Sequence, residues 1–461
     1  MAEKETDENV RILAQGQYIS NDTWKTRLNN NDLIIGPSGA GKTRTYVKPN
    51  IMQCNESMII ADTKGNLHRQ VRPLLEEEGY QILILDVKNL KNSCGYNPFD
   101  FIRFDHERKA FQEQDILTVS SVLVPLDPRK ENPFFDMSAR MYLSALIGYS
   151  LECRPKAEHN LDSVYSLLSI LSSDPDEFEN MMERLKFRDE HSFAVRQYQL
   201  FRSNRSIATV HNTILGILGE RLSTLCFSNV VELYTSDNRI DFKRLGREKT
   251  VVFLSISDTD RSLDRLTSLF YTQALQVLCN QADETPKGRL RIPVRFILDD
   301  FATNTFIEGF DNIVSVTRSR EIYISIILQS ITQLNALYGE ERSQTIINNF
   351  DHCIYLGGQD VVTAKYMSVK SEIPVAEILN MPLDKAFLFR RGSRAALVDR
   401  YDIKFHPNYM RIPESETDAV LPARRERVRR RPLDEDGERA ERPERPERPE
   451  RPERPERRPV E

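Results

Sequence analysis

Eight consecutive residues near the start of the chain have the types and spacing needed to hold a nucleoside triphosphate. They fit the pattern G-x-x-x-x-G-K-[ST] without deviation and read Gly36-Pro37-Ser38-Gly39-Ala40-Gly41-Lys42-Thr43. Glycines let the backbone turn tightly, so that its N–H groups converge on phosphate oxygens at the start of a helix. We expect Lys42 to reach the β- and γ-phosphates and the Thr43 hydroxyl to ligate Mg²⁺. The segment predicts ATP or GTP binding; the alternative is a degenerate loop that binds weakly and hydrolyses nothing.

Two acidic residues supply the second half of such a site. Asp299 and Asp300 directly follow the apolar run Phe296-Ile297-Leu298. A magnesium-dependent NTPase needs a carboxylate at the end of a neighbouring strand, so Asp299 is expected in the shell of the metal and Asp300 beside the attacking water. The alternative is a pair of acids that only caps a strand end. The chain has no guanine-reading Asn-Lys-x-Asp, which favours ATP as the nucleotide.

Further polar residues follow or precede apolar runs that read as strands. Gln329 closes the run 324–328, where an amide can sense the γ-phosphate, although an ordinary polar residue there explains the pattern too. Arg318 and Arg320 precede that run, and either could act as an arginine finger on the nucleotide of a neighbouring subunit. A surface salt bridge explains each arginine equally well. Lys64, in Asp62-Thr63-Lys64-Gly65, could contact phosphate or be a solvated turn residue.

The elements that must position these residues are short apolar runs separated by polar or helical sequence. Such runs, rich in β-branched residues, are typical of strands buried on both faces of a parallel α/β sheet, and they occupy residues 33–35, 58–61, 82–85, 251–254, 296–298, 324–328 and 354–356. Residues 386–398 resemble a hairpin. The pattern predicts a nucleotide-binding domain of class α/β with a mostly parallel sheet, formed by residues 31–104 and 236–408.

The remaining segments have a different character. Residues 105–235 carry apolar residues at helical spacing, which predicts an all-α insert, and residues 1–30 are polar and are expected along the surface. Residues 409–461 are rich in arginine, glutamate and proline, with tandem Arg-Pro-Glu triplets from Arg442 to Glu456. This composition predicts a disordered tail, with a docking arm for an acidic partner or nucleic acid as the alternative.

Composition excludes several other classes of protein. The six cysteines are scattered, which fits neither a zinc site nor a disulfide framework and suits a reducing cytosol. No apolar run approaches the roughly 18 to 20 residues that span a bilayer, and the acidic, polar start of the chain is unlike a secretory signal. The net charge of −5 argues against a generally nucleic-acid-coating surface but leaves room for DNA in a local channel.

The order of the motifs resembles that of the type IV secretion coupling proteins, the TraG/TraD group of conjugation ATPases, and most of all members from mobile elements of Gram-positive bacteria. The resemblance covers roughly residues 12–405. Besides the residues above, it rests on Val47-Lys48-Pro49-Asn50, Tyr96-Asn97-Pro98-Phe99, Asp136-Met137-Ser138-Ala139-Arg140, Phe296 to Ala302, Arg318 to Glu321, Gln329 to Leu334 and Leu356-Gly357-Gly358.

The resemblance implies a RecA-like domain with a helical cap that faces the cytoplasm, a homo-hexamer, and ATP-driven delivery of relaxase-bound single-stranded DNA to a membrane channel. Members of the group usually begin with membrane-spanning helices, whereas this chain starts almost at the motor domain. We therefore expect a cytoplasmic protein that contacts the membrane only through partners, including the channel components.

A second departure concerns the acidic pair. The group usually has glutamate where this chain has Asp300, whose side chain is one methylene shorter. Because small placement errors are costly in catalysis, we expect slow hydrolysis or hydrolysis only on assembly. An alternative function is an ATP-binding cargo receptor or assembly platform with weak or no hydrolysis. A cytosolic motor outside conjugation, akin to FtsK-type or packaging ATPases, is a third hypothesis, against which the motifs of the insert argue.

Overall fold

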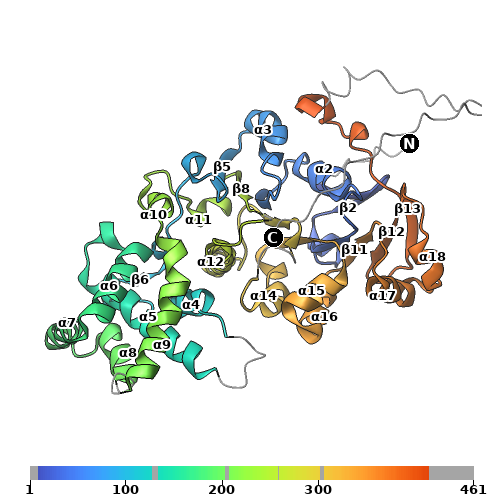
Figure 1. The fold of residues 1–461 in the computed structure, drawn as a ribbon. Helices are drawn as coiled ribbons and strands as arrows, with labels where there is room; N and C mark the ends of the chain where they lie inside the picture. Colours follow the sequence, from blue (N-terminus) through green and yellow to red (C-terminus); the bar gives the residue numbers. More distant parts are fainter. Residues whose placement is uncertain (1–8, 127–132, 203–206, 258, 302–305, 415–461) are drawn as a thin grey trace, which may run out of the picture. The chain divides into compact units, whose positions relative to one another are not determined.

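The computed structural model describes residues 9–126, 133–202, 207–257, 259–301 and 306–414. A nine-stranded sheet forms its centre, with the strand order β13-β12-β11-β3-β10-β9-β4-β8-β5 (Figure 1). The strands are β3 (Asp32–Ile35), β4 (Ser57–Ala61), β5 (Gln81–Asp86), β8 (Thr250–Ser255), β9 (Val294–Leu298), β10 (Ile322–Leu328), β11 (His352–Tyr355), β12 (Lys385–Arg390) and β13 (Ala396–Asp399). Each apolar run that predicts a strand lies in or at the end of one of them.

The sheet is parallel from β11 to β5, while β12 and β13 extend it as an antiparallel hairpin. Every residue of β3, β4, β8, β9, β10 and β11 is buried, as expected of parallel strands covered on both faces. Alternate residues of β3 enter different hydrophobic clusters, because successive side chains point to opposite faces. The predicted α/β sheet is confirmed.

Helices cover the sheet, and most of them follow a strand, as in other α/β domains (Figure 1). Those that connect or flank its strands are α2 (Lys48–Ile51), α3 (Leu67–Glu77), α11 (Phe242–Leu245), α12 (Asp264–Asp283), α14 (Phe310–Val316), α15 (Ile331–Tyr338), α16 (Glu340–Asn348), α17 (Val361–Ser371) and α18 (Val375–Leu379). The buried apolar residues of α12, among them Leu269 and Phe270, belong to the hydrophobic cluster on one face of the sheet.

The segment between β5 and β8 is helical, with one small exception. Its helices are α4 (Glu113–Leu123), α5 (Phe134–Cys153), α6 (Leu161–Ser173), α7 (Pro175–Arg188), α8 (Phe193–Arg202), α9 (Ala208–Ser223) and α10 (Ser228–Thr235), drawn from teal to green in Figure 1. Two short antiparallel strands, β6 (Phe104–Asp105) and β7 (Ala110–Phe111), open it, so the expected all-α character does not extend to residue 105. Its core is continuous with that of the sheet, since residues of both share one hydrophobic cluster.

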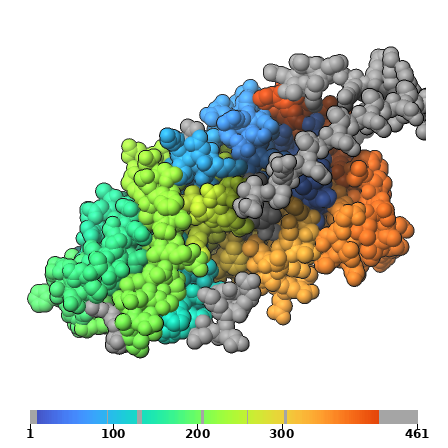
Figure 2. Space-filling model, in the orientation of Figure 1, coloured from blue at the N-terminus to red at the C-terminus, as the bar shows by residue number. Residues whose placement is uncertain are grey.

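The end of the described chain packs against the sheet domain. Tyr409 and Ile412 are buried, and Arg411 pairs with Glu77 and Glu78 at the end of α3. Figure 2 shows the end of the described chain, in orange-red, seated against the blue segment that includes α3. Packing therefore continues past residue 408, where the sheet domain was expected to end. The predicted disordered tail lies, from residue 415 onward, outside the described residues.

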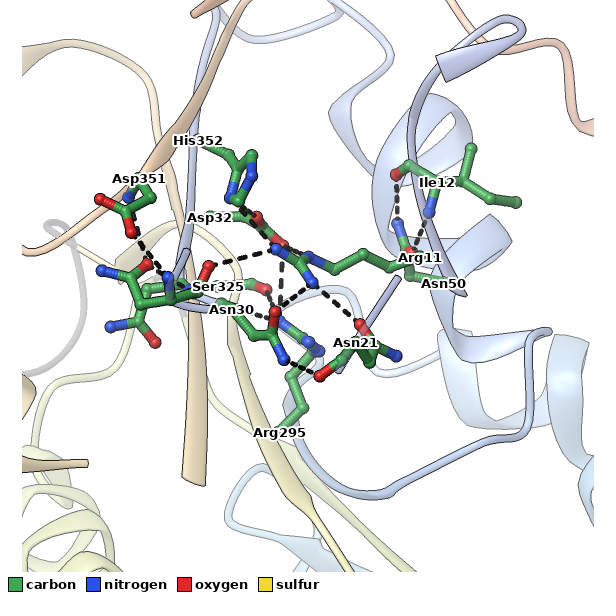
Figure 3. Close-up of polar contacts among 12 residues, drawn as sticks. Arg11, Ile12, Asn21, Asn30, Asp32, Asn50, Arg295, Ser325, Asp351 and His352 are labelled. Atoms are coloured by element: carbon green, nitrogen blue, oxygen red, sulfur yellow. Dashed lines mark hydrogen bonds and ion pairs between the residues drawn. The ribbon is translucent and has the colours of Figure 1, made fainter. Parts of the chain in front are cut away.

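The first described residues are not the surface segment that their polarity predicts. Val10–Ala14 and Gln17–Ser20 form a hairpin, β1 and β2, in which Arg11, Ile12 and Leu13 are buried. Figure 3 shows Arg11 among polar side chains at the start of β3, where its Nε donates to Asp32 Oδ2 at 2.8 Å. The predicted surface position is wrong for these residues, because the charge of the buried Arg11 is compensated by Asp32, which is not its neighbour in sequence.

The same hairpin is bonded to the helix that follows the glycine-rich loop. The side-chain amide of Asn50 accepts from Ile12 N at 2.8 Å and donates to Ile12 O at 2.9 Å (Figure 3). Its amide nitrogen also donates to Tyr46 O at 2.8 Å. The first strand of the chain is thereby tied to the element that begins at the predicted phosphate site.

Two further sequence expectations concern cysteines and membrane helices. All six cysteines are free, as their scattered positions predict. Among the described helices no single one combines the length and apolarity needed to cross a membrane; one bent pair, Ala208–Cys226 with Ser228–Thr235, satisfies the test by length and composition.

Candidate functional site

The glycine-rich loop lies where β3 ends, between the ends of two neighbouring strands. Gly36 N donates to Leu328 O at the end of β10, and Leu356 N, just past β11, donates to Ile35 O. Gly39 and Gly41 have φ values of +80° and +81°, in the left-handed region that favours glycine. A Cβ on Gly36 would lie 2.9 Å from the Cβ of Leu356, so this position requires glycine for close approach.

The side chain of Lys42 is bonded to the start of this loop. Its Nζ donates to Gly36 O at 2.7 Å and to Pro37 O at 3.1 Å, and only 8% of the residue is exposed. Burial lowers the pKa of Lys42, while Asp300 and Asp299 act in the opposite direction. A buried ammonium group held only by carbonyl oxygens gains from a nearby anion, which suits a phosphate-binding role.

Thr43 and Asp299 come together although 256 positions separate them. The Thr43 hydroxyl donates to Asp299 Oδ2 at 3.2 Å, and Asp300 N donates to Asp299 Oδ1 at 3.1 Å. Burial raises the pKa of Asp299 to about 6, and the neighbouring Asp300 adds to the shift. A divalent cation here would stabilise the ionised carboxylate.

The donor set fits Mg²⁺ held jointly with a substrate. A hydroxyl and a carboxylate oxygen are hard ligands, and Mg²⁺ is commonly bound by one or two carboxylates together with substrate phosphates and water. Within the described ranges there is no group of three or more His, Cys, Asp or Glu side chains that could hold a metal. Thr43 and Asp299 would therefore hold the ion only in combination with phosphate oxygens.

Gln329 lies beside the acidic pair because β10 runs between β3 and β9. Its Nε2 donates to Asp300 Oδ1 at 3.4 Å, and its Oε1 accepts from Gln333 Nε2 at 3.3 Å. Asp300 itself has a φ of +50°, a left-handed conformation that is uncommon for residues other than glycine. The carboxyl ends of β3, β10 and β9 thus bring Lys42, Asp299, Asp300 and Gln329 into one polar site.

The turn after β4 and the two arginines before β10 lie at different edges of the sheet. Asp62 accepts from Gly65 N and Leu67 N, and the exposed Lys64 is close enough for its charge to act on Lys42. Arg318 and Arg320 precede β10, whose other end carries Gln329, so they are remote from the loop of the same chain. Arg320 is bound to Asp283 through two hydrogen bonds of 2.8 and 3.0 Å, whereas Arg318 is exposed.

Two residues of this region have no local sequence signal. Tyr46, three positions after Thr43, is buried and donates to Asp32 Oδ2 at 2.6 Å. Arg400, the residue after β13, donates through Nη1 to Ala40 O in the glycine-rich loop at 2.8 Å. Both contacts follow from tertiary structure, and an isolated arginine after a predicted hairpin gives no reason to place it there.

The sheet order, the loop and the acidic strand end together define a RecA-like P-loop protein. More specifically, the chain belongs to the family described as type IV secretory system conjugative DNA transfer, whose model matches residues 3–371. The resemblance to type IV secretion coupling proteins is thereby confirmed.

Relatives and solved structures agree with this family. The VirD4 proteins of Rhizobium rhizogenes and of Agrobacterium fabrum are each 23% identical over 359 residues, which is 77% of this chain and 50% of each relative. The chain spans about half the length of the curated relatives it matches. The conjugative coupling protein TrwBdeltaN70 has a similar fold, with a TM-score of 0.65, 17% identity, and coverage of 84% of this chain and 87% of that one.

Two further TrwB structures contain nucleotides. The complex of TrwB with the ATP analogue ADPNP has a TM-score of 0.62 and 16% identity, and covers 82% of this chain and 86% of that one. The complex with ADP and Mg²⁺ has a TM-score of 0.61 and 17% identity, with coverages of 81% and 86%. These similarities show the fold.

Proposed function

We propose that this protein is an ATP-dependent coupling protein of conjugative type IV secretion, which binds and hydrolyses ATP to deliver relaxase-bound single-stranded DNA to the transfer channel. In this proposal it works as a homo-hexamer in the cytoplasm and reaches the cytoplasmic face of the membrane through channel components. The observation that carries the proposal is the 3.2 Å contact between Thr43 and Asp299, because it joins the phosphate loop to the acidic strand end.

Each residue of the site has a role that its position supports. The loop from Gly36 to Thr43 offers backbone N–H groups to the phosphates, and Lys42 neutralises the β- and γ-phosphates. Thr43 and Asp299 would hold Mg²⁺, which when bound would neutralise negative charge that develops on the phosphates. Asp300 orients or deprotonates the attacking water, and Gln329, which donates to Asp300, senses the γ-phosphate.

Relatives support both the ligand and the class of reaction. Structures of TrwB are known in complex with ADPNP and with ADP and Mg²⁺. The domain that carries the glycine-rich loop of this chain has a fold similar to that of TrwB. The family description names conjugative DNA transfer. Phosphoryl transfer needs positioning and charge neutralisation more than covalent chemistry, and the site provides both.

A second candidate is an ATP-binding cargo receptor or assembly platform with little hydrolysis. The conformation of Asp300 favours it: the residue is left-handed, with a φ of +50°, and its carboxylate already accepts from Gln329. A short acid held in this way has limited reach toward a water molecule. The two candidates share the nucleotide site and differ in turnover.

The deciding experiment measures ATP hydrolysis by the purified protein with and without single-stranded DNA, for the wild type and Lys42→Ala. The coupling-protein proposal predicts Mg²⁺-dependent hydrolysis that DNA stimulates and that Lys42→Ala reduces by about a hundredfold or more. Lys25→Ala, an exposed position in α1 (Thr23–Thr26) outside the loop, is the matched control. Nucleotide binding without DNA-stimulated hydrolysis would favour the cargo receptor, and no binding would contradict both.

A further inference from the structure

We infer that Arg400 is a positioning residue of the phosphate-binding loop, which it fixes against the end of β11 in the conformation that binds nucleotide. The inference rests on the proposed function of that loop. Arg400 uses all three parts of its guanidinium group: Nε donates to Lys385 O at 2.9 Å, Nη1 to Ala40 O at 2.8 Å and Nη2 to Leu356 O at 2.7 Å.

The topology of the sheet explains why Arg400 reaches the loop. β12 is antiparallel to β11, and β13 is antiparallel to β12, so β13 runs in the same direction as β11. β13 therefore ends at the edge where β3 and β11 end, which is the edge of the loop. Arg400 is the first residue after β13, and its own N–H donates to Asp384 O at 3.1 Å, which continues the hairpin.

The contact with Ala40 has a direct consequence for the following residue. A trans peptide unit is planar, and its C=O and N–H point in opposite directions. No cis peptide is present among the described residues. Fixing the Ala40 carbonyl on Arg400 therefore also fixes the N–H of Gly41, which points in the opposite direction within the same plane. In a loop of this type that N–H is one of the donors that cradle phosphate.

The contact with Leu356 fixes the loop as a whole. Gly36, at the start of the loop, approaches Leu356 so closely that a Cβ would have no room. Arg400 holds Leu356 O and Ala40 O at once, and these are the two residues nearest to where a Cβ on Gly36 would lie, at 2.9 and 3.2 Å from their Cβ atoms. A guanidinium is planar and its donors have a fixed geometry, whereas a lysine in its place could offer charge but not three divergent N–H groups.

The polar partners that the described structure gives Arg400 are backbone carbonyls, not carboxylates. The group is half-buried, and burial lowers the pKa of Arg400, with only Asp384 acting in the opposite direction. Partial burial of a cation is unfavourable when no carboxylate compensates its charge. Even an exposed ion pair would contribute little to stability. A role in positioning the loop accounts for a half-buried arginine at this place.

The segment that carries Arg400 is itself held along the helix after the loop. Asn408 Nδ2 donates to Met52 O at 2.9 Å, and Glu414 forms ion pairs with Arg44 and Lys48. Residues 400–414 thus contact this part of the chain at several points. They lie beyond residue 371, where the match to the family model ends, so this support is separate from the motifs that define the family.

The test compares Arg400→Met and Arg400→Lys with Arg411→Met, a matched control in the same segment whose partners are Glu77, Glu78 and Asn408. Binding of a fluorescent, non-hydrolysable ATP analogue with Mg²⁺ is titrated for each protein. We expect both substitutions of Arg400 to raise Kd by about tenfold, because neither side chain can hold Ala40 O and Leu356 O as the guanidinium does, and Arg411→Met to stay within about twofold.

Hydrogen–deuterium exchange without nucleotide provides the second readout, and it is valid even where overall stability falls. Exchange of the peptide that contains residues 36–43 should accelerate in Arg400→Met and Arg400→Lys but not in Arg411→Met. Unchanged loop exchange in Arg400→Met, or full affinity in Arg400→Lys, would overturn the inference. A wild type that does not bind the analogue would overturn the proposed function instead, and loop exchange would still decide the role of Arg400.

Discussion

The hydroxyl of Thr43 lies 3.2 Å from Oδ2 of Asp299, in a site where Asp300 adds a second carboxylate. The hydroxyl donates to one of two adjacent acidic residues, so it relieves their mutual repulsion only in part. The pKa of Asp299 is raised to about 6 by burial and by Asp300. At neutral pH the two carboxylates therefore repel each other, and a divalent cation would relieve this repulsion.

The first prediction concerns Asp299→Asn and pH. The pKa of Asp299 is above its unfolded value near 4, so the folded protein keeps a proton that the unfolded chain loses between about pH 4 and pH 6. Stability contributed by this group is present at low pH and is lost as pH rises through 6. Since the side chain is partly exposed, we expect Asp299→Asn to stabilise the metal-free protein by about 2 kcal/mol at pH 7 and by little at pH 4.5, measured by denaturant unfolding.

The same substitution should abolish Mg²⁺-dependent hydrolysis, because the amide cannot neutralise the ion. Ser315→Ala, on the exposed face of α14, serves as a control for both measurements. A stability gain at pH 4.5 as large as that at pH 7 would show that the electrostatic account of Asp299 is wrong.

The second prediction is that Asp300→Glu increases ATP turnover. The longer side chain brings the carboxylate closer to the water that attacks the γ-phosphate, and misplacement by 1 Å can cost on the order of a hundredfold in rate. Steady-state kinetics should show a rise in kcat with little change in KM. Asp300→Asn is the control: asparagine tolerates the left-handed backbone at this position but cannot act as a base, so kcat should fall. An unchanged kcat in Asp300→Glu would mean that Asp300 suffices or is not catalytic.

Much of this site can be predicted from the sequence because its signals are local. A run such as Leu33-Ile34-Ile35 identifies a buried strand, and the glycines and Lys42 that follow it define the loop within eight residues. The edge at which Asp299 and Gln329 meet the loop follows from parallel pairing alone. For this reason the residues brought together by β3, β9 and β10 are those that the pattern indicates.

Arg11 and Arg400 could not be predicted, for a shared physical reason. Charged residues are normally exposed, and an exception becomes visible only when the partner is known. Arg11 is buried because Asp32 and His352 lie around it, and Arg400 reaches Ala40 because three strands fix the direction of β13. Local composition carries neither piece of information.

The third prediction is that Arg11→Met destabilises the fold strongly. Burial alone would raise the pKa of Asp32, yet it is well below the usual range because Arg11, His352 and Arg295 surround it. Removing Arg11 leaves a buried carboxylate with less compensation, so chemical denaturation should show a loss of about 3 to 5 kcal/mol. Arg72→Met, which breaks an exposed pair with Glu76, should cost less than about 1 kcal/mol. Similar losses in both variants would refute a special role for the buried cluster.

The fourth prediction tests whether Arg318 acts on the nucleotide of a neighbouring subunit. Arg318 is exposed at the edge of the sheet opposite its own loop, whereas Arg320 is held by Asp283. An arginine that contributes in trans is worth on the order of a thousandfold in rate, so Arg318→Ala should be nearly inactive, and Arg320→Ala should retain most of its activity. Lys42→Ala should be inactive for a different reason.

Mixing the two inactive proteins separates these causes. In a randomly mixed ring, an Arg318→Ala subunit with an intact loop meets a Lys42→Ala subunit with an intact Arg318 at roughly a quarter of the interfaces. An equimolar mixture should therefore recover about a quarter of wild-type hydrolysis at the same total concentration. A mixture no more active than its components would refute a role of Arg318 in trans, because a residue that acts only within its own chain cannot be supplied by a partner.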